Sequence, residues 1–213
     1  MPDNYRFPPA LLNSYHALAV LAGISFLMAL LSPGKVGSLG GYAGFLGPPL
    51  FLSAMALLAG ILGVHVGGME QAWWATRPLP ASRTLWRLAG LVALGLGLLF
   101  PFLAAFRALA GGGWVAMLGV AGLLFAVGLT WAGIGFITGS VIKSGGVRFI
   151  AVYGCLILVY FVPLIAALPV SPIIAVIALW KGDLEYELTG FLGWWGLAAV
   201  ALGGVWLWKR RRY

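Results

Sequence analysis

The residues best suited to contact a soluble partner lie in one interval, from Gly67 to Arg87, with the sequence GGMEQAWWATRPLPASRTLWR. It is the longest interval without a strongly apolar run, and it holds Glu70, the only glutamate among the first 184 residues. It also contains a tryptophan pair, three arginines and two prolines that flank Leu79. Tryptophan and arginine are favoured anchors at protein interfaces. A contact with a soluble protein is therefore expected here.

Residue groupings that support catalysis are missing from the sequence. Ser32-Pro33-Gly34-Lys35 lacks the spacing of a GxxxxGK[ST] phosphate-binding loop, and no Ser/His/Asp grouping is credible. The single cysteine, Cys155, lies in an apolar run and cannot form an intrachain disulfide. No metal-ligand spacing is present. We therefore expect no enzymatic activity, metal or cofactor in this chain itself.

Two histidines, His16 and His65, are expected near the same membrane face. Two imidazoles at similar depth on neighbouring helices could serve as axial ligands of a haem. Each histidine also lies at the end of a predicted helix, where a solvated histidine is ordinary. The solvated histidine is the favoured interpretation, and haem ligation is the alternative.

The composition indicates an all-α, polytopic integral membrane protein. Of the 213 residues, 62% are hydrophobic and 8% are charged, whereas a soluble domain has about 25% charged residues. Apolar runs of about 20 residues are typical of transmembrane helices. Six such spans form one transmembrane domain, at residues 12–31, 45–66, 86–106, 114–138, 149–168 and 190–208.

Two connections have patterns of their own. In residues 67–85, a short helix is expected to begin at Gly68 and to end at Pro78, with Met69, Trp73 and Thr76 on one face. Such a helix can lie in the membrane interface or fill a groove on a partner. Between the fifth and sixth spans, PVSPIIAVIALW is too short to cross a bilayer and is expected to be interfacial or re-entrant.

The basic residues predict the orientation of the spans. With six spans, ten Lys and Arg residues fall on the side of the N-terminus and three, Lys35, Arg107 and Lys181, fall on the opposite side. Because basic residues are enriched on the cytoplasmic side, both termini and residues 67–85 are expected in the cytoplasm, with the protein in the cytoplasmic membrane. The net charge of +8 is thus explained by topology, and nucleic-acid binding is not expected.

Glycines and charges also constrain the interior of the bundle. Gly63/Gly67 and Gly135/Gly139 have the four-residue spacing that lets helices approach closely in lipid, although glycine is frequent in membrane helices in any case. No predicted span has an ionisable residue at its centre. Because such residues mark ion and proton pathways, an ion-coupled pump is disfavoured.

The pattern resembles the permeases of ABC-2-type ATP-binding-cassette transporters. In that family a second span leads into an acidic cytoplasmic helix, a proline-containing turn and a basic start to the third span. The matching residues here are Glu70, Thr76-Arg77-Pro78-Leu79-Pro80, Ser82-Arg83 and Arg87. Gly139–Ser144 and Leu168–Pro172 are similar to later elements of the family, and the last span ends in arginines as the family's does.

The resemblance implies the permease half of an exporter. Two permease subunits, identical or different, would pair in the membrane, and ATP and Mg would bind to separate nucleotide-binding ATPase subunits. The second and fifth spans would line the path. The contact with the ATPase would be made by a coupling segment: Met69, Glu70, Trp73, Trp74, Arg77, Pro78 and Arg83.

Two other functions remain open. His65-Val66-Gly67-Gly68, the following Ala-Trp element and Ser82-Arg83 faintly resemble quinol-interacting membrane anchors of multi-subunit oxidoreductases. Such anchors usually have more spans and a deep charged residue. The third possibility is a scaffold subunit without a transport role.

Overall fold

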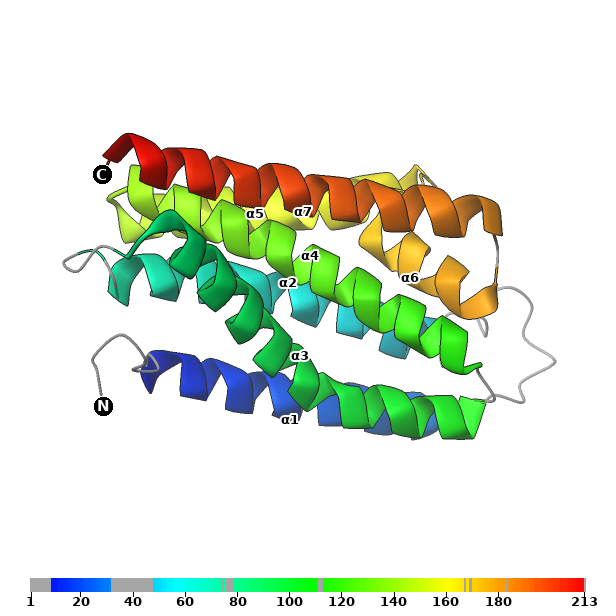
Figure 1. Cartoon of the computed structure of the whole chain (residues 1–213). Coiled ribbons are helices and arrows are strands. Elements are labelled where there is room, and N and C mark those ends of the chain that lie inside the picture. The colour runs from blue at the N-terminus through cyan, green and yellow to red at the C-terminus, as the bar shows by residue number, and fades with distance from the viewer. Residues whose placement is uncertain are drawn as a thin grey trace.

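The computed structural model describes residues 9–31, 48–73, 75, 79–110, 113–166, 168, 170–182 and 184–212. These residues form a bundle of helices that run roughly along a common direction (Figure 1). Among the described residues, six helices are long and apolar enough to cross a membrane, as many as the spans predicted from the sequence. Helices satisfy every backbone polar group internally, and lipid offers no other partner for those groups.

The six long helices match the predicted spans and extend most of them. They are α1 (Pro9–Leu31), α2 (Pro48–Trp73), α3 (Ala81–Ala110), α4 (Trp114–Val141), α5 (Gly145–Ile165) and α7 (Leu184–Arg212). Pro101 lies inside α3, and this helix changes direction along its length in Figure 1.

The segment between the last two long helices contains a short helix, α6 (Pro172–Lys181). Its ten residues cannot span a bilayer, but most of them are buried against α2, α4 and α7. The helix ends at Gly182, whose φ of 74° is left-handed and favours glycine. The segment is thus a short helix packed against the bundle, and its interfacial or re-entrant placement stays a prediction.

Helices α2 and α4 form the centre of the bundle. About 67% and 61% of their spanning residues are buried, against 17% to 28% for the other four spans. The two helices contact each other more extensively than any other pair. A Cβ atom at Gly135 would lie 2.7 Å from the carbonyl oxygen of Val64, so glycine is needed where the two backbones meet.

The peripheral helices present one stripe to the centre and apolar side chains to the outside. In α3 the buried residues recur every three or four positions, from Leu88 through Leu99 to Phe106. Hydrogen bonds join the layers: the Tyr15 hydroxyl of α1 donates to the Leu91 carbonyl at 2.7 Å, and the Tyr160 hydroxyl of α5 donates to the Ala56 carbonyl at 2.8 Å.

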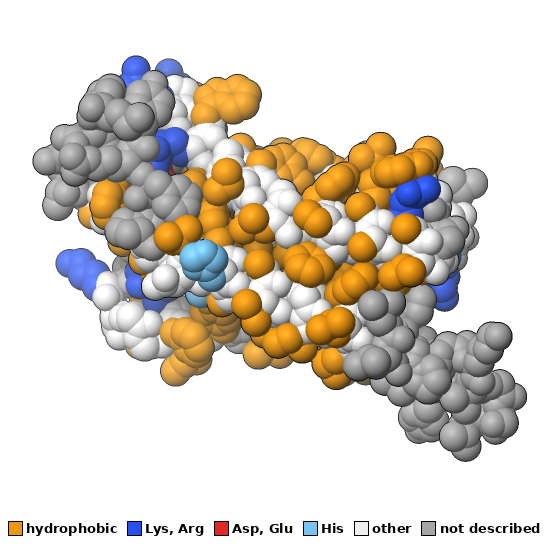
Figure 2. Space-filling view, turned by 90° about the horizontal axis from the view of Figure 1, so that it is seen from below, with side chains coloured by type: hydrophobic (Ala, Val, Ile, Leu, Met, Phe, Trp, Pro, Cys, Tyr) orange, Lys and Arg blue, Asp and Glu red, His pale blue; other side chains and the backbone are white. Residues whose placement is uncertain are grey.

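The surface divides into an apolar middle and basic ends. In Figure 2 hydrophobic side chains cover most of the visible face, and the visible Lys and Arg side chains lie at the two ends of the molecule. One end holds the start of α1, the end of α2, the start of α3 and the end of α7 (Figure 1). We call it the charged end, because it contains Glu70, Arg83, Arg87, Arg148 and Lys209.

Candidate functional site

The predicted coupling segment begins as a continuation of α2. This helix runs through Gly67 and Gly68 to Trp73 without a break, so a separate helix beginning at Gly68 is not formed. Gly67 is held against the backbone of Ala132 and Phe136 in α4, and this packing continues the helix across two glycines. Leu79 and Pro80 then precede α3. Trp74, Thr76, Arg77 and Pro78 lie outside the described residues.

Glu70 is buried at the charged end rather than presented to a partner. Its side chain is 0% exposed and pairs with Arg87 of α3. The Arg87 Nε donates to Oε1 at 2.5 Å and its Nη2 donates to Oε2 at 3.1 Å. This is the bidentate arrangement that best matches a guanidinium to a carboxylate. The ion pair holds the end of α2 against the start of α3.

A third charge joins this pair from the last helix. The Lys209 side chain of α7 is buried, and its Nζ donates to the carbonyl oxygen of Leu79 at 3.3 Å. The same ammonium lies 5.6 Å from the centre of the Phe136 ring of α4 and interacts electrostatically with Glu70. The connection between α2 and α3 is thereby attached to both α7 and α4.

Three of the predicted contact residues are exposed at this end. Met69 and Trp73 lie four residues apart on α2 and are 36% and 38% exposed, and Arg83 is exposed in the first turn of α3. Glu70 points into the bundle between them. The available surface of the described coupling segment is therefore apolar and aromatic, with one exposed arginine.

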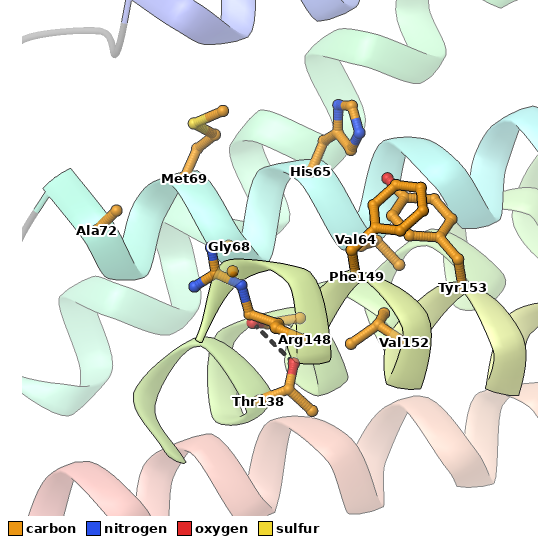
Figure 3. A pocket seen from close by; sticks show the side chains of 12 residues that line it. Val64, His65, Gly68, Met69, Ala72, Thr138, Arg148, Phe149, Val152 and Tyr153 are labelled. Atoms are coloured by element: carbon orange, nitrogen blue, oxygen red, sulfur yellow. Dashed lines mark hydrogen bonds between the residues drawn. The ribbon is translucent and has the colours of Figure 1, made fainter. Parts of the chain in front are cut away.

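A pocket of about 240 Å³ lies beside this surface, between α2, α4 and α5 (Figure 3). Its wall includes apolar side chains, among them Met69, Phe149 and Val152, and the polar side chains His65, Thr138, Arg148 and Tyr153. The Phe149 and Tyr153 rings pack against each other with centroids 4.6 Å apart. The pocket combines apolar walls with a single cationic side chain, so it suits a ligand that has both an apolar part and an anionic part.

The two histidines have different environments. His65 is partly buried, and its Nδ1 lies 3.0 Å from the Ser14 hydroxyl of α1 in a hydrogen bond. His16 is exposed on α1. Among the described residues, no group of three or more His, Cys, Asp and Glu side chains could hold a metal ion. His65 thus joins α2 to α1 through this hydrogen bond and also lines the pocket.

Sequence reasoning missed the partners of Glu70 and the role of Lys209. The sequence does contain a signal for the pairing of Glu70 with Arg87. The two residues lie on either side of the same short connection, so they can pair when α2 and α3 lie side by side. Lys209 was counted only as one of four residues that end the last span. The pocket had no signal in the sequence, because its wall comes from three helices.

Comparison of the chain with protein-family models, with curated proteins and with solved structures finds no significant match.

Proposed function

We propose that this chain is the membrane-spanning permease subunit of an ATP-binding-cassette exporter. In this proposal it forms the translocation path with a second permease subunit, identical or different, and a separate subunit hydrolyses ATP. The resemblance of residues 70–87 to the ABC-2 permeases supports it, and so does the presence of six apolar helices. Both termini and the charged end would face the cytoplasm, by the excess of basic residues on that side.

The attachment of the α2–α3 connection to the bundle is the observation that carries the proposal. A subunit that drives transport must transmit motion from its docking surface to the spans. Here Glu70 and Arg87 join α2 to α3, and Lys209 joins the connection to α7. A force applied beside Met69 and Trp73 would act directly on α2, one of the two central helices.

The docking surface in this proposal is apolar and basic, whereas the cytoplasmic helix of the ABC-2 permeases is acidic. Met69 and Trp73 supply exposed apolar area, and Arg83 supplies an exposed charge. Glu70 acts inside the bundle by holding α2 and α3 together. Trp74, Arg77 and Pro78 are proposed as contacts with the ATPase on the basis of the resemblance alone. The same basis supports α2 and α5 as walls of the translocation path.

The test is purification of the tagged full-length chain from its native membrane in mild detergent, followed by measurement of bound ATP-binding subunits and ATPase activity. We expect a stoichiometric ATPase partner. Trp73→Ala should lower the amount of bound partner at least about tenfold, as truncation of an interface anchor does. Trp195→Ala is the matched control, because Trp195 has nearly the same exposure, 37%, but lies away from the charged end.

Two results would count against the proposal. One is a purified complex that lacks an ATP-binding subunit, and the other is a Trp73→Ala chain that retains its ATPase partner as fully as Trp195→Ala does. A haem absorption band or quinol-dependent electron transfer in the same preparation would instead support the redox-anchor function.

A further inference from the structure

Arg148 places a cation in the wall of a largely apolar pocket. Its side chain is partly buried in the first turn of α5 and lines the pocket (Figure 3), and its Nη1 lies 3.6 Å from the place of a Cβ atom at Gly139 of α4. Among the described residues, its guanidinium makes no hydrogen bond and no ion pair. Removing a charge from water is costly unless it is paired. The five N–H donors of this group therefore favour a ligand that brings acceptor oxygens.

The other polar groups around the pocket do not neutralise Arg148. The Thr138 hydroxyl donates back to the carbonyls of its own helix, to Ile134 at 2.7 Å and Gly135 at 3.2 Å. The carboxylate of Glu70 is held by Arg87. Among the residues that the structure describes, the positive charge of Arg148 is therefore uncompensated, which favours an anion as ligand. A phosphate group meets this requirement, because a guanidinium binds it bidentately, as it binds a carboxylate.

The size and surroundings of the pocket indicate what is attached to the phosphate. Its volume of about 240 Å³ is below the range of roughly 300–1,000 Å³ for pockets that enclose a whole small ligand. Most of a larger ligand must therefore lie outside. The adjoining surface of α5 is strongly apolar, with Val147, Phe149 and Ile150 exposed by 58%, 63% and 73%.

The position of the pocket along the spans matches the expected position of lipid phosphates. It is at the charged end of the spans, close to the first turn of α5 and the last turns of α2 and α4. A span of about 20 residues crosses the hydrocarbon layer, so its ends reach the headgroup region. A membrane lipid can place its headgroup in the pocket and keep its chains in the hydrocarbon.

We propose that the pocket between α2, α4 and α5 is a binding site for an anionic phospholipid. Arg148 binds the phosphate, and Phe149 and Ile150 contact the acyl chains. A lipid with a net negative charge binds better than a zwitterionic one, because the cationic headgroup of the latter would lie near Arg148. The site does not depend on an ATPase partner, so it can be tested on the purified chain alone.

The experiment is a titration of the delipidated, detergent-solubilised full-length chain, with bound lipid counted by native mass spectrometry. The probes are dioleoylphosphatidylglycerol, dioleoylphosphatidylcholine and inorganic phosphate. We expect phosphatidylglycerol to bind about tenfold more tightly than phosphatidylcholine, because Arg148 repels the choline cation by about 1 kcal/mol. Arg148→Gln should abolish this preference, and Arg148→Lys should keep part of it. The exposed Lys143→Gln is the matched control.

A second variant fills the pocket without disturbing the fold. A Cβ atom at Gly68 meets nothing within 4 Å, so Gly68→Leu places its side chain in open space within the pocket. It should reduce phosphatidylglycerol binding about tenfold. Gly97→Leu is the control, because Gly97 also has open space but lines a different, apolar pocket between α3 and its neighbours.

Three outcomes would overturn the proposal. They are equal binding of the two lipids to the unmodified chain, an unchanged preference in Arg148→Gln, and unchanged binding in a folded Gly68→Leu. Binding of inorganic phosphate as tight as that of phosphatidylglycerol would also overturn it, because the site would then serve a free anion. Circular dichroism and gel filtration establish that each variant is folded.

Discussion

Glu70 is a fully buried carboxylate in this bundle. An unpaired carboxylate at this depth would be very costly, and the bidentate contact with Arg87 offsets that cost. Lys209 adds a second nearby positive charge from another helix. Because each of the three groups comes from a different helix, the cluster is satisfied only when α2, α3 and α7 are correctly packed.

Removing the charge of Glu70 should therefore destabilise the protein. Glu70→Gln removes the carboxylate that pairs with Arg87 and attracts Lys209, and we expect a loss of about 3 kcal/mol in the free energy of unfolding. The measurement is unfolding of the purified chain in detergent. In Glu70→Gln/Arg87→Gln, the loss should be clearly smaller than the sum of the two single losses.

Arg83→Gln provides the comparison for this prediction. Arg83 is exposed, and its replacement should change stability by less than about 0.5 kcal/mol. Equal effects of Glu70→Gln and Arg83→Gln would show that the buried ion pair does not hold the helices together.

At the scale of the elements, the contact between α2 and α4 depends on glycine. A Cβ atom at Gly63 would lie 2.9 Å from that of Trp131, and one at Gly67 would lie 2.7 Å from the backbone nitrogen of Phe136. In lipid the hydrophobic effect does not drive helices together, so close backbone packing must supply much of the association. The two central helices are joined along this glycine face.

Two adjacent glycines of α2 should consequently respond in opposite ways to the same change. Gly67→Ala forces a methyl group against α4, and we expect a loss of about 2 kcal/mol or more in stability. Gly68→Ala points into open space, and the better helix propensity of alanine should leave stability unchanged or raise it by up to about 1 kcal/mol. Unfolding of both variants in the same detergent tests this pair. Similar losses in the two would contradict the packing described here.

At the scale of the whole molecule, the distribution of basic residues distinguishes the two ends of the bundle. The charged end holds Arg83, Arg87, Lys143, Arg148 and the residues from Lys209 to Arg212, whereas the described part of the opposite end holds Arg107 and Lys181. Arg107 stacks over the Trp114 ring, with its guanidinium carbon 3.6 Å from the ring centre. This asymmetry predicts that the charged end faces the cytoplasm.

Labelling with a membrane-impermeant thiol reagent measures this orientation. Cys155, which is exposed, is first replaced by serine, and single cysteines are then placed at Gly113 and Arg83. We expect Gly113→Cys to react in intact cells and Arg83→Cys to react only after the membrane is permeabilised. The reverse pattern would place the charged end outside and would remove the basis for a cytoplasmic ATPase contact.

The sequence alone determined the number of spans and their approximate limits. Long apolar runs have only one stable solution in a bilayer, so composition and length are enough to predict six helices. The spacing of Gly63 and Gly67 indicated a close helix contact, because two helix backbones can approach closely only where the side chains between them are small. The exact helix ends were not predictable in the same way, and α2 continues about two turns beyond its predicted limit at residue 66.

Only the tertiary structure decided the roles of the polar residues near those ends. Glu70 looked like an exposed contact because the sequence shows which residues lie between apolar runs, but not which way each one points. Its burial follows from the positions of Arg87 and Lys209 on two other helices. The pocket around Arg148 is likewise lined by residues of three helices. Such features depend on distances between segments far apart in the chain, which local patterns do not contain.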